Sequence, residues 1–336
     1  MSTWQDEVLA LAPVWRRSPS AHNTQPATLT ASADGLELGW DPGRELVIGD
    51  PTRRDLWLSL GAHAECVVIA AAGAGIPLRV DWAIDAIRRR AALLVRDPAA
   101  PAPAFTAAEV TQRRSARGPY REPHTAGDEV AQVATAAGVT EAGLRLDVIP
   151  AGLVDALLPQ ADRWNYSAPE QVRELRRWLR LHPGHPAYHQ DGLSDRALAL
   201  PRSQAVALRA ALSEPVWRVL ARTGGPELMA RFGQPDGRGT VVALIADSGQ
   251  VVGAAQVAET GRLLLRIWLA AARVGLHVHP LSQLIDAPSP AAALTRWAAQ
   301  AGGGDPRVLA VFRIGVPTQE PVRSARRGGD TARGTG

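Results

Sequence analysis

Apolar residues recur every three or four positions along two long segments, and this spacing predicts two buried helices. The apolar face of the first segment is formed by Leu56, Leu60, Ala64, Val67 and Ala71. The apolar face of the second is formed by Val257, Leu264, Leu265, Trp268 and Ala272. Each segment ends near a glycine, Gly75 in the first and Gly275 in the second. Their similar length and apolar character predict that both helices lie at the centre of the fold.

Shorter elements are expected around these helices. Ser167 and Glu170 have the spacing of a capping box and predict the start of a third helix. The dipeptide Asp34-Gly35 predicts a hairpin turn between two strands. Runs of β-branched and aliphatic residues predict strands at 28–32, 36–40, 79–84, 92–96, 144–149, 240–246 and 308–315. Because helices and strands alternate, we expect a layered α+β or α/β architecture.

A segment rich in proline and alanine, residues 98–106, divides the chain. The two parts, 1–97 and 107–316, each read as a helix, a polar loop, a long helix and a strand, which suggests an internal repeat. The second part carries an insertion of mixed character at about 155–239. The Arg/Gly-rich stretch 317–336 is expected to be a disordered tail.

Composition excludes several classes of protein. Of 336 residues, 46% are hydrophobic and 21% are charged, which is typical of a folded globular protein. All 37 basic residues are arginine, but they are mixed with acids to a net charge of +4, so no nucleic-acid partner is expected. A lone cysteine, Cys66, excludes an intrachain disulfide. Without a signal-peptide pattern or a long apolar run, we expect a cytoplasmic protein with no membrane partner.

Familiar catalytic signatures are absent. The chain has no GxGxxG, P-loop, CxxC, HExxH or GxSxG motif, which disfavours dinucleotide-binding, P-loop and common hydrolase sites. His182, His185 and His189 have a spacing that could reach one metal ion. Two prolines and a glycine interrupt this run, and no carboxylate is arranged beside it. We therefore expect a surface or lid loop there and no metal site.

Two polar runs carry candidate chemistry. In Arg16–Pro26, Pro19, Ser20, Asn23 and Gln25 supply turn-forming and amide groups suited to the edge of a flat heterocycle. The alternative is an ordinary loop between a helix and a strand.

The second run, Arg113–Tyr120, places guanidinium groups at an expected helix start. Arg113, Ser115 and Arg117 offer the forked donors and the hydroxyl that suit a phosphate. The alternative is a solvated, arginine-rich helix face. A third polar stretch, 275–283, follows the second long helix. In it His277 and His279 alternate on an extended segment and are candidates for a catalytic role.

Together these segments resemble the flavin-dependent nitroreductase superfamily, in particular its twin, fused-subunit branch typified by Acg-like proteins. The resembling motifs are Pro-Ser-Ala-His-Asn-Thr-Gln-Pro at 19–26, Arg-Arg-Ser-Ala-Arg at 113–117, the stretch 275–283 and Arg313. The resemblance spans nearly all of residues 1–316 and is weakest in the insertion. It implies an α+β fold of two fused pseudo-repeats, each a small mixed sheet flanked by helices. The halves would form an intramolecular pseudo-dimer, so the chain could be monomeric.

The resemblance also implies FMN as cofactor, one per chain, because the second half lacks a Pro-Ser-x-x-Asn loop and position 20 is serine rather than arginine. The phosphate would be held by Arg113, Ser115, Arg117 and Arg313. The ring or ribityl chain would be held by Pro19, Ser20, Asn23 and Gln25, with Pro280, Leu281 and Ser282 at the ring edge. No catalytic side chain is assigned, since the flavin itself carries the hydride chemistry.

The chain departs from the family in two respects. Ala27 stands where the family loop usually ends in tryptophan, and no lysine is present to sit near the flavin. The expected function is an FMN-dependent oxidoreductase acting on a small organic substrate, with either NAD(P)H or oxygen as redox partner. The alternatives are a flavin-storage protein, in which the insertion covers the cofactor as a lid, and an interaction protein that has lost the cofactor.

Overall fold

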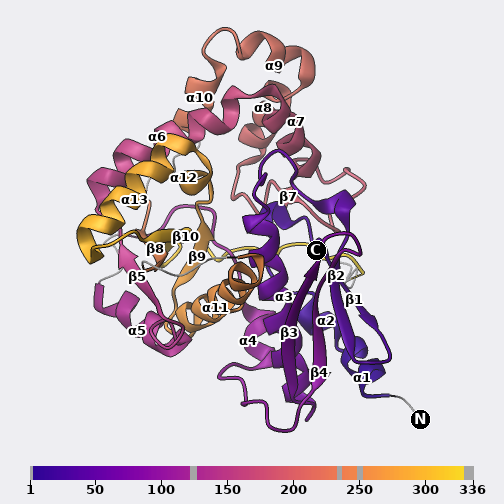
Figure 1. Ribbon diagram of the computed structural model, residues 1–336. Helices are drawn as coiled ribbons and strands as arrows, with labels where there is room; N and C mark the ends of the chain where they lie inside the picture. Colours follow the sequence, from indigo (N-terminus) through magenta and orange to yellow (C-terminus); the bar gives the residue numbers. More distant parts are fainter. Residues whose placement is uncertain (1–2, 122–126, 233–236, 248–252, 329–336) are drawn as a thin grey trace.

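The computed structural model describes residues 3–121, 127–232, 237–247 and 253–328. Two long helices, α3 (Arg54–Gly73) and α11 (Ala254–Arg273), pack against each other at the centre, with a four-stranded sheet on either side (Figure 1). The expected α+β architecture and both central helices are confirmed. Most of the apolar core is one cluster that joins the helix pair to both sheets.

The other elements of the first half are α1 (Trp4–Ala10), α2 (Ala12–Trp15), η1 (Ala21–Asn23), β1 (Ala27–Ala31), β2 (Leu36–Trp40), η2 (Pro42–Arg44), β3 (Leu78–Asp85) and β4 (Arg90–Arg96). The second half has α4 (Ala107–Gln112), α5 (Gly127–Ala137), β5 (Leu144–Val148), β8 (Thr240–Ala246), β9 (His277–Pro280), α12 (Gln283–Asp286), α13 (Pro288–Gly302) and β10 (Arg307–Gly315). Between β5 and β8 lie α6 (Ala151–Ser167), α7 (Pro169–Trp178), β6 (Leu179–Arg180), β7 (Leu193–Ser194), α8 (Arg202–Ala211), α9 (Glu214–Leu220) and α10 (Gly225–Phe232).

Both sheets are antiparallel, so the expected mixed sheets are wrong. Short turns join β1 to β2 and β3 to β4, and a tight turn can only bring its strands together antiparallel. The strand orders are β1-β2-β4-β3 and β5-β8-β10-β9. Counted within each half, the strands follow the same order, and the long helix connects the second strand to the third in both.

The central helices approach closely at two glycines. A Cβ atom at Gly61 would overlap the carbonyl oxygen of Ala258, and one at Gly261 would overlap that of Leu58. The two contacts are equivalent, because Gly261 and Ala258 of α11 stand 200 positions after Gly61 and Leu58 of α3. Only glycine lets the two backbones approach this closely.

The ends of the two helices also match. Gly75 and Gly275 both have φ +77°, a left-handed conformation that glycine adopts without strain. The next residues, Ile76 and Leu276, each donate a main-chain hydrogen bond of 2.9 Å back into the last turn of their helix. The helix and turn therefore recur as one unit in the two halves.

By length and composition α3 is apolar enough to cross a membrane. Of its apolar window, 89% is buried inside the protein, where α11 and the first sheet cover it. Its apolar character is accounted for by this burial.

Two expected helix starts are wrong. Ser167 ends α6, where its hydroxyl donates to the carbonyl of Trp164, and α7 starts at Pro169 without a side-chain cap. Arg113 follows the end of α4 rather than opening a helix. Thr106, seven residues earlier, forms the capping box of α4 with Glu109, so the arginine run is left extended beyond the helix.

The insertion packs on the first half. Its helices enclose a small apolar cluster of Val172, Leu212, Trp217 and Met229 (Figure 1). The carboxylate of Glu174 accepts hydrogen bonds from the main-chain N–H groups of Ile48 and Gly49, at 3.1 and 2.7 Å. These bonds bring the insertion over the first half although it belongs to the second.

Candidate functional site

Three of the predicted segments meet on the second sheet. Ser115 forms an isolated parallel bridge with Val278 of β9, and Ala116 donates to the carbonyl of Val278 at 3.3 Å. On the other side of β9, His279 pairs with Arg313 of β10. The arginine run, the stretch 275–283 and Arg313 are thus brought together by strand pairing.

Arg113 is one of the two buried side chains among the predicted phosphate ligands, with 6% of its surface exposed. Its guanidinium lies over the ring of Trp268 at 5.1 Å from the centroid. One nitrogen donates to the carbonyl of Arg17 at 3.1 Å and another to Oγ of Ser115 at 3.3 Å. The remaining nitrogen, Nε, is buried without a hydrogen-bond partner. A buried donor of this kind is destabilising unless a further acceptor is present.

Arg313 is held by a histidine predicted as a catalytic candidate. Its Nε donates to Nδ1 of His279 at 3.1 Å, and its guanidinium lies 4.8 Å from the ring centroid of Tyr120. Because Nδ1 accepts this bond, the ring proton of His279 is on Nε2. Burial, followed by the charges of Arg313 and Arg117, keeps the pKa of His279 well below its usual value. His279 therefore stays neutral and orients Arg313.

His277 lies two residues away, on the same strand. Its Nδ1 is buried without a partner, and burial is the main cause that lowers its pKa. Like His279 it is neutral at neutral pH, which does not suit a cationic proton donor.

The loop predicted to read a heterocycle is strained. Three of its residues, His22, Asn23 and Gln25, have φ of 46°, 55° and 53°. Non-glycine residues adopt such angles only when their surroundings hold them there, at about 1–3 kcal/mol each. One such support is local: Oγ of Ser20 accepts a hydrogen bond from the main-chain N–H of Gln25 at 2.9 Å.

The two amides of this loop bind the protein itself. Nδ2 of Asn23 donates to the carbonyls of Gly192 and Ala325, both at 3.1 Å. The side chain of Gln25 donates to the carbonyl of Gln190 at 2.8 Å and accepts from the N–H of Arg327 at 3.0 Å. In this conformation, Asn23 and Gln25 hold the loop to the insertion and the tail rather than presenting their amides to a ligand. Pro19 and Ser20 are half-buried beside them.

The tail expected to be disordered is ordered over residues 317–328, and residues 329–336 lie outside the described part. Pro317 forms a bridge with Tyr120, and Arg326 is 7% exposed. The guanidinium of Arg326 makes five hydrogen bonds, each between 2.6 and 3.0 Å. Its acceptors are the carbonyls of Arg16, Arg17, Ser18 and Ala325 and Oδ1 of Asn23. The disorder prediction is wrong here because buried acceptors, which the tail's own composition does not reveal, bind this arginine.

The positive charges of the site are not neutralised within the described residues. Burial and neighbouring arginines lower the pKa of Arg113 and of Arg17 to about 10, and that of Arg326 falls well below its usual value for the same reasons. Burial and Arg313 likewise lower the pKa of Arg117 to about 10. No carboxylate in the described ranges is among the causes of these shifts. The site is suited to an anion.

The insertion closes over the same region. Besides its contacts with Asn23 and Gln25, its residue Ala197 accepts a 3.4 Å hydrogen bond from Arg117. Arg44 of the first half binds Asp191 through an ion pair of 3.0 Å. Residues 190–197 therefore connect the strained loop with the arginine run.

The three predicted ring-edge residues differ in exposure. Leu281 is a core residue, 5% exposed, and its N–H donates to the carbonyl of Val311 at 2.8 Å. Pro280 and Ser282 flank it and are half-buried, with Ser282 preceding the short helix α12. Leu281 anchors this turn, and its two neighbours are the residues that can face a ligand.

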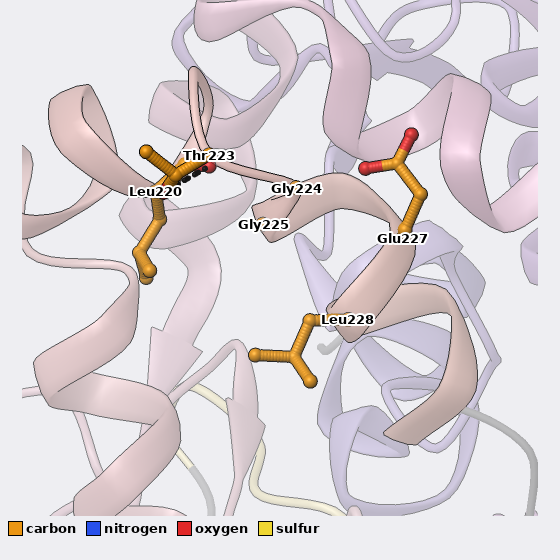
Figure 2. A pocket seen from close by; sticks show the side chains of 6 residues that line it. All are labelled: Leu220, Thr223, Gly224, Gly225, Glu227 and Leu228. Carbon is orange, nitrogen blue, oxygen red and sulfur yellow. Dashed lines mark hydrogen bonds between the residues drawn. The ribbon is translucent and has the colours of Figure 1, made fainter.

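A separate hollow lies in the insertion, between α9 and α10 (Figure 2). It has a volume of about 280 Å³ and is lined by Leu220, Thr223, Gly224, Gly225, Glu227 and Leu228. It contains none of the predicted site residues, and its one carboxylate points away from Leu220 (Figure 2). The arginine-lined region is therefore the stronger candidate.

Sequence reasoning missed Arg17, Trp268 and Arg326 as parts of the site. A signal existed for Arg17, because Arg-Arg-Ser occurs both at 16–18 and at 113–115. For Trp268 the sequence predicts only a core position on the second long helix. For Arg326 the sequence carries no signal beyond an arginine-rich tail.

No family model matches the chain. Two curated relatives, from Mycobacterium tuberculosis strains H37Rv and CDC 1551, carry the provisional names NAD(P)H nitroreductase Rv3131 and MT3217. Each is 31% identical over 166 residues, which are 48% of this chain and 48% of the relative. The chain is similar to nitroreductases. It spans about half the length of the curated relatives it matches.

Solved structures give a weaker likeness. The FMN-dependent nitroreductase NfnB from Mycobacterium smegmatis, in complex with NADPH, is 17% identical, with a TM-score of 0.35 over 62% of this chain and 86% of that chain. A nitroreductase with bound FMN from Desulfitobacterium hafniense is 16% identical, with a TM-score of 0.36 over 68% and 95%. TM-scores this low do not establish a shared fold. Support for the nitroreductase superfamily therefore comes from the curated relatives.

Proposed function

We propose that the chain binds FMN between its two halves and acts as a nitroreductase-type oxidoreductase. The observation that carries the proposal is a group of three arginines, the buried Arg113 and the half-buried Arg17 and Arg117, which have no carboxylate partner in the described residues. A phosphate monoester carries about two negative charges and several acceptor oxygens, and forked guanidinium donors match them.

The residues present fit the phosphate end of this cofactor. The Nε atoms of Arg113 and Arg17 are buried donors without partners. Arg117 has one long hydrogen bond, which leaves further donors on its guanidinium. The guanidinium of Arg313 is held beside β9 by its hydrogen bond to His279 and its contact with the ring of Tyr120.

At the ring end the fit is different from the sequence prediction. Since Asn23 and Gln25 are engaged by the protein, ring recognition would fall to main-chain groups of the loop and to Pro280 and Ser282. Bound FMN would supply hydride transfer. The chain would hold the phosphate, orient the ring against the loop and, through residues 190–197, limit the access of water.

We also propose that the halves are fused pseudo-subunits, as in the twin branch. The shared strand order, the helix pair of equal length and the reciprocal contacts of Gly61 and Gly261 support this arrangement. The loop 16–26 comes from the first half and the arginine run from the second, so the site lies between them. A single chain would then suffice for one complete site.

The test of the cofactor proposal is the absorbance spectrum of the purified protein, with the mass of the cofactor released from it. A yellow protein that releases FMN is expected, and reconstitution with FMN should be weakened in Arg117→Ala by about 1.5–3 kcal/mol for a lost charged hydrogen bond. A colourless protein that takes up no FMN would contradict the proposal.

A storage role is the second candidate, because the insertion and the tail both bind the loop beside the proposed ring position. Anaerobic mixing of the FMN-loaded protein with NADH and with NADPH separates the two. Bleaching of the flavin by either donor supports the enzyme, as the names of the curated relatives suggest. A flavin that no donor bleaches supports storage.

A further inference from the structure

In the described part of the tail, residues 317–328, one side chain is deeply buried. Residues 318–320, 322 and 323 are exposed, whereas Arg326 is 7% exposed. The tail leaves the last strand of the second half and crosses to the first half, where Arg326 lies beside Asn23 (Figure 1). The tail is thus attached to the loop mainly at this one residue and its neighbours.

The hydrogen bonds of Arg326 leave nothing for a ligand. A guanidinium has five N–H donors, and all five are used within the protein. Four acceptors are main-chain carbonyls and the fifth is an amide oxygen, so none of them is an anion. Arg326 therefore differs from Arg113, whose Nε is free, and its role is to hold other groups in place.

The groups that Arg326 holds are those of the strained loop. It binds the three consecutive carbonyls of residues 16–18, at the entrance of the loop, and the side chain of Asn23, at its left-handed centre. Its neighbours reinforce the contact, since Ala325 accepts from Asn23 and Arg327 donates to Gln25. The left-handed residues Asn23 and Gln25 are both tied to this segment.

We propose that Arg326 is a positioning residue that holds the loop 19–25 in the conformation required for cofactor binding, so that docking of the tail and loading of the site are coupled. The proposal rests on the proposed cofactor site. Residues 325–327 form a clamp on this loop. When the clamp is released, the loop relaxes to unstrained angles and the site between the halves loses one of its walls.

Arg326→Ala and its neighbour Arg327→Ala form a matched pair. Both remove one positive charge from the clamp, but the side chain of Arg327 is exposed and its contact with Gln25 uses the main-chain N–H, which alanine keeps. Arg326→Lys keeps the charge, although one ammonium group cannot reach the five acceptors. The series separates the geometry of the clamp from its charge.

The first measurement is hydrogen–deuterium exchange on the cofactor-free full-length protein. Asn23, Thr24 and Gln25 donate hydrogen bonds within the loop and report its conformation. We expect exchange at these amides to be at least tenfold faster in Arg326→Ala and in Arg326→Lys than in the wild type or Arg327→Ala. Exchange in α3 should be the same in all four proteins and reports that each is folded.

The second measurement is FMN affinity of the same proteins, followed by flavin fluorescence. The dissociation constant should rise at least tenfold in Arg326→Ala and Arg326→Lys and less than twofold in Arg327→Ala, and millimolar guanidinium should restore part of the loss in Arg326→Ala. Unchanged loop exchange in both Arg326 variants overturns the proposal, because the loop would then keep its conformation without the hydrogen bonds of Arg326. If the wild type binds no FMN, the proposed function fails, while the exchange measurement still decides whether the clamp holds the loop.

Discussion

The two halves share a framework and differ in what surrounds it. Each has four antiparallel strands in the same order and a 20-residue helix after the second strand. In the first half a short turn joins β1 to β2, whereas residues 149–239 separate β5 from β8. The Arg-Arg-Ser run of the first half is followed by a strained loop, and that of the second by Ala116 and Arg117.

This difference shows how a repeated framework can form a single asymmetric site. The core positions are under the same packing constraint in both halves, because the two long helices cover each other. The loops that leave the framework have no such constraint. In the proposed site the first half supplies a loop and Arg17, and the second supplies the other cations, an insertion and a tail. The following predictions test this division, from the largest expected effect to the smallest.

Removing the close approach of the central helices should have the largest effect. Gly61→Ala and Gly261→Ala each place a methyl group against a main-chain carbonyl of the other helix, so the helices must move apart. We expect the free energy of unfolding to fall by about 3 kcal/mol in each variant, at the upper end for overpacking. Urea unfolding measures it. Gly73→Ala is the control, because this exposed residue lies at a helix end where a new Cβ meets only an ordinary van der Waals contact with Ala107. A loss of stability in only one of the two central-glycine variants would contradict the equivalence of the helices.

Arg113→Met should separate the binding of an anion from stability. Methionine keeps apolar contact with Trp268 but removes a buried charge beside Arg17. FMN affinity should fall by about 1.5–3 kcal/mol. The cofactor-free protein should be as stable as the wild type or more so, because like charges no longer repel.

Arg16→Met is the matched change for Arg113→Met, since Arg16 opens the corresponding run of the first half and is exposed. Titration calorimetry should give Arg16→Met the same FMN affinity as the wild type. Equal losses in both variants would show that the site is not asymmetric.

His63 is a buried polar residue of α3, and the equivalent position of α11, 200 residues later, is the apolar Leu263. This pair therefore tests a polar difference between the two helices. Nδ1 of His63 lies 2.9 Å from Oγ of Ser18, and burial, then the charges of Arg16 and Arg326, lowers its pKa to about 3. The unfolded chain takes up this proton near the usual value of 6.5, so the stability from this group is present above pH 6.5 and lost as the pH falls toward 3.

The variant His63→Leu should remove this dependence. Below pH 6.5 the wild type should lose stability relative to the variant by about 1.4 kcal/mol per pH unit, the effect of one proton. Urea unfolding between pH 7 and pH 5 measures the difference. Parallel plots of unfolding free energy against pH for the two proteins would show that His63 is protonated in the folded protein as readily as in the unfolded chain.

The smallest effect is expected at the helix ends. Gly75→Ala and Gly275→Ala keep open space around the new methyl group but force alanine into φ +77°. Each should lower the free energy of unfolding by about 1 kcal/mol. The two losses should agree, because the turns have the same conformation. Thermal unfolding of both variants under one condition measures the two losses. If the losses clearly differ, α3 and α11 are equivalent only along the helices and not at the turns that follow them.

Much of the framework was predictable because its causes are local. The apolar stripes predicted α3 and α11, and the turn at Asp34-Gly35 predicted the β1–β2 hairpin, since helix period and turn type depend on neighbouring residues. At β9 the alternation of His277 and His279 predicted an extended segment but no strand, because four residues with two histidines and a proline are not typical of a strand. It is a strand because β10 pairs with it.

The sequence by itself determined the two apolar helices, most of the strands and the segments that carry arginine and amide groups. Tertiary structure alone decided that Asn23 binds the protein and that Arg326 is buried. Asn23 and Arg326 are 303 positions apart, and no local pattern records a contact over that separation. The physical reason is that a buried donor must find an acceptor, and the folded chain alone determines which acceptor is within reach.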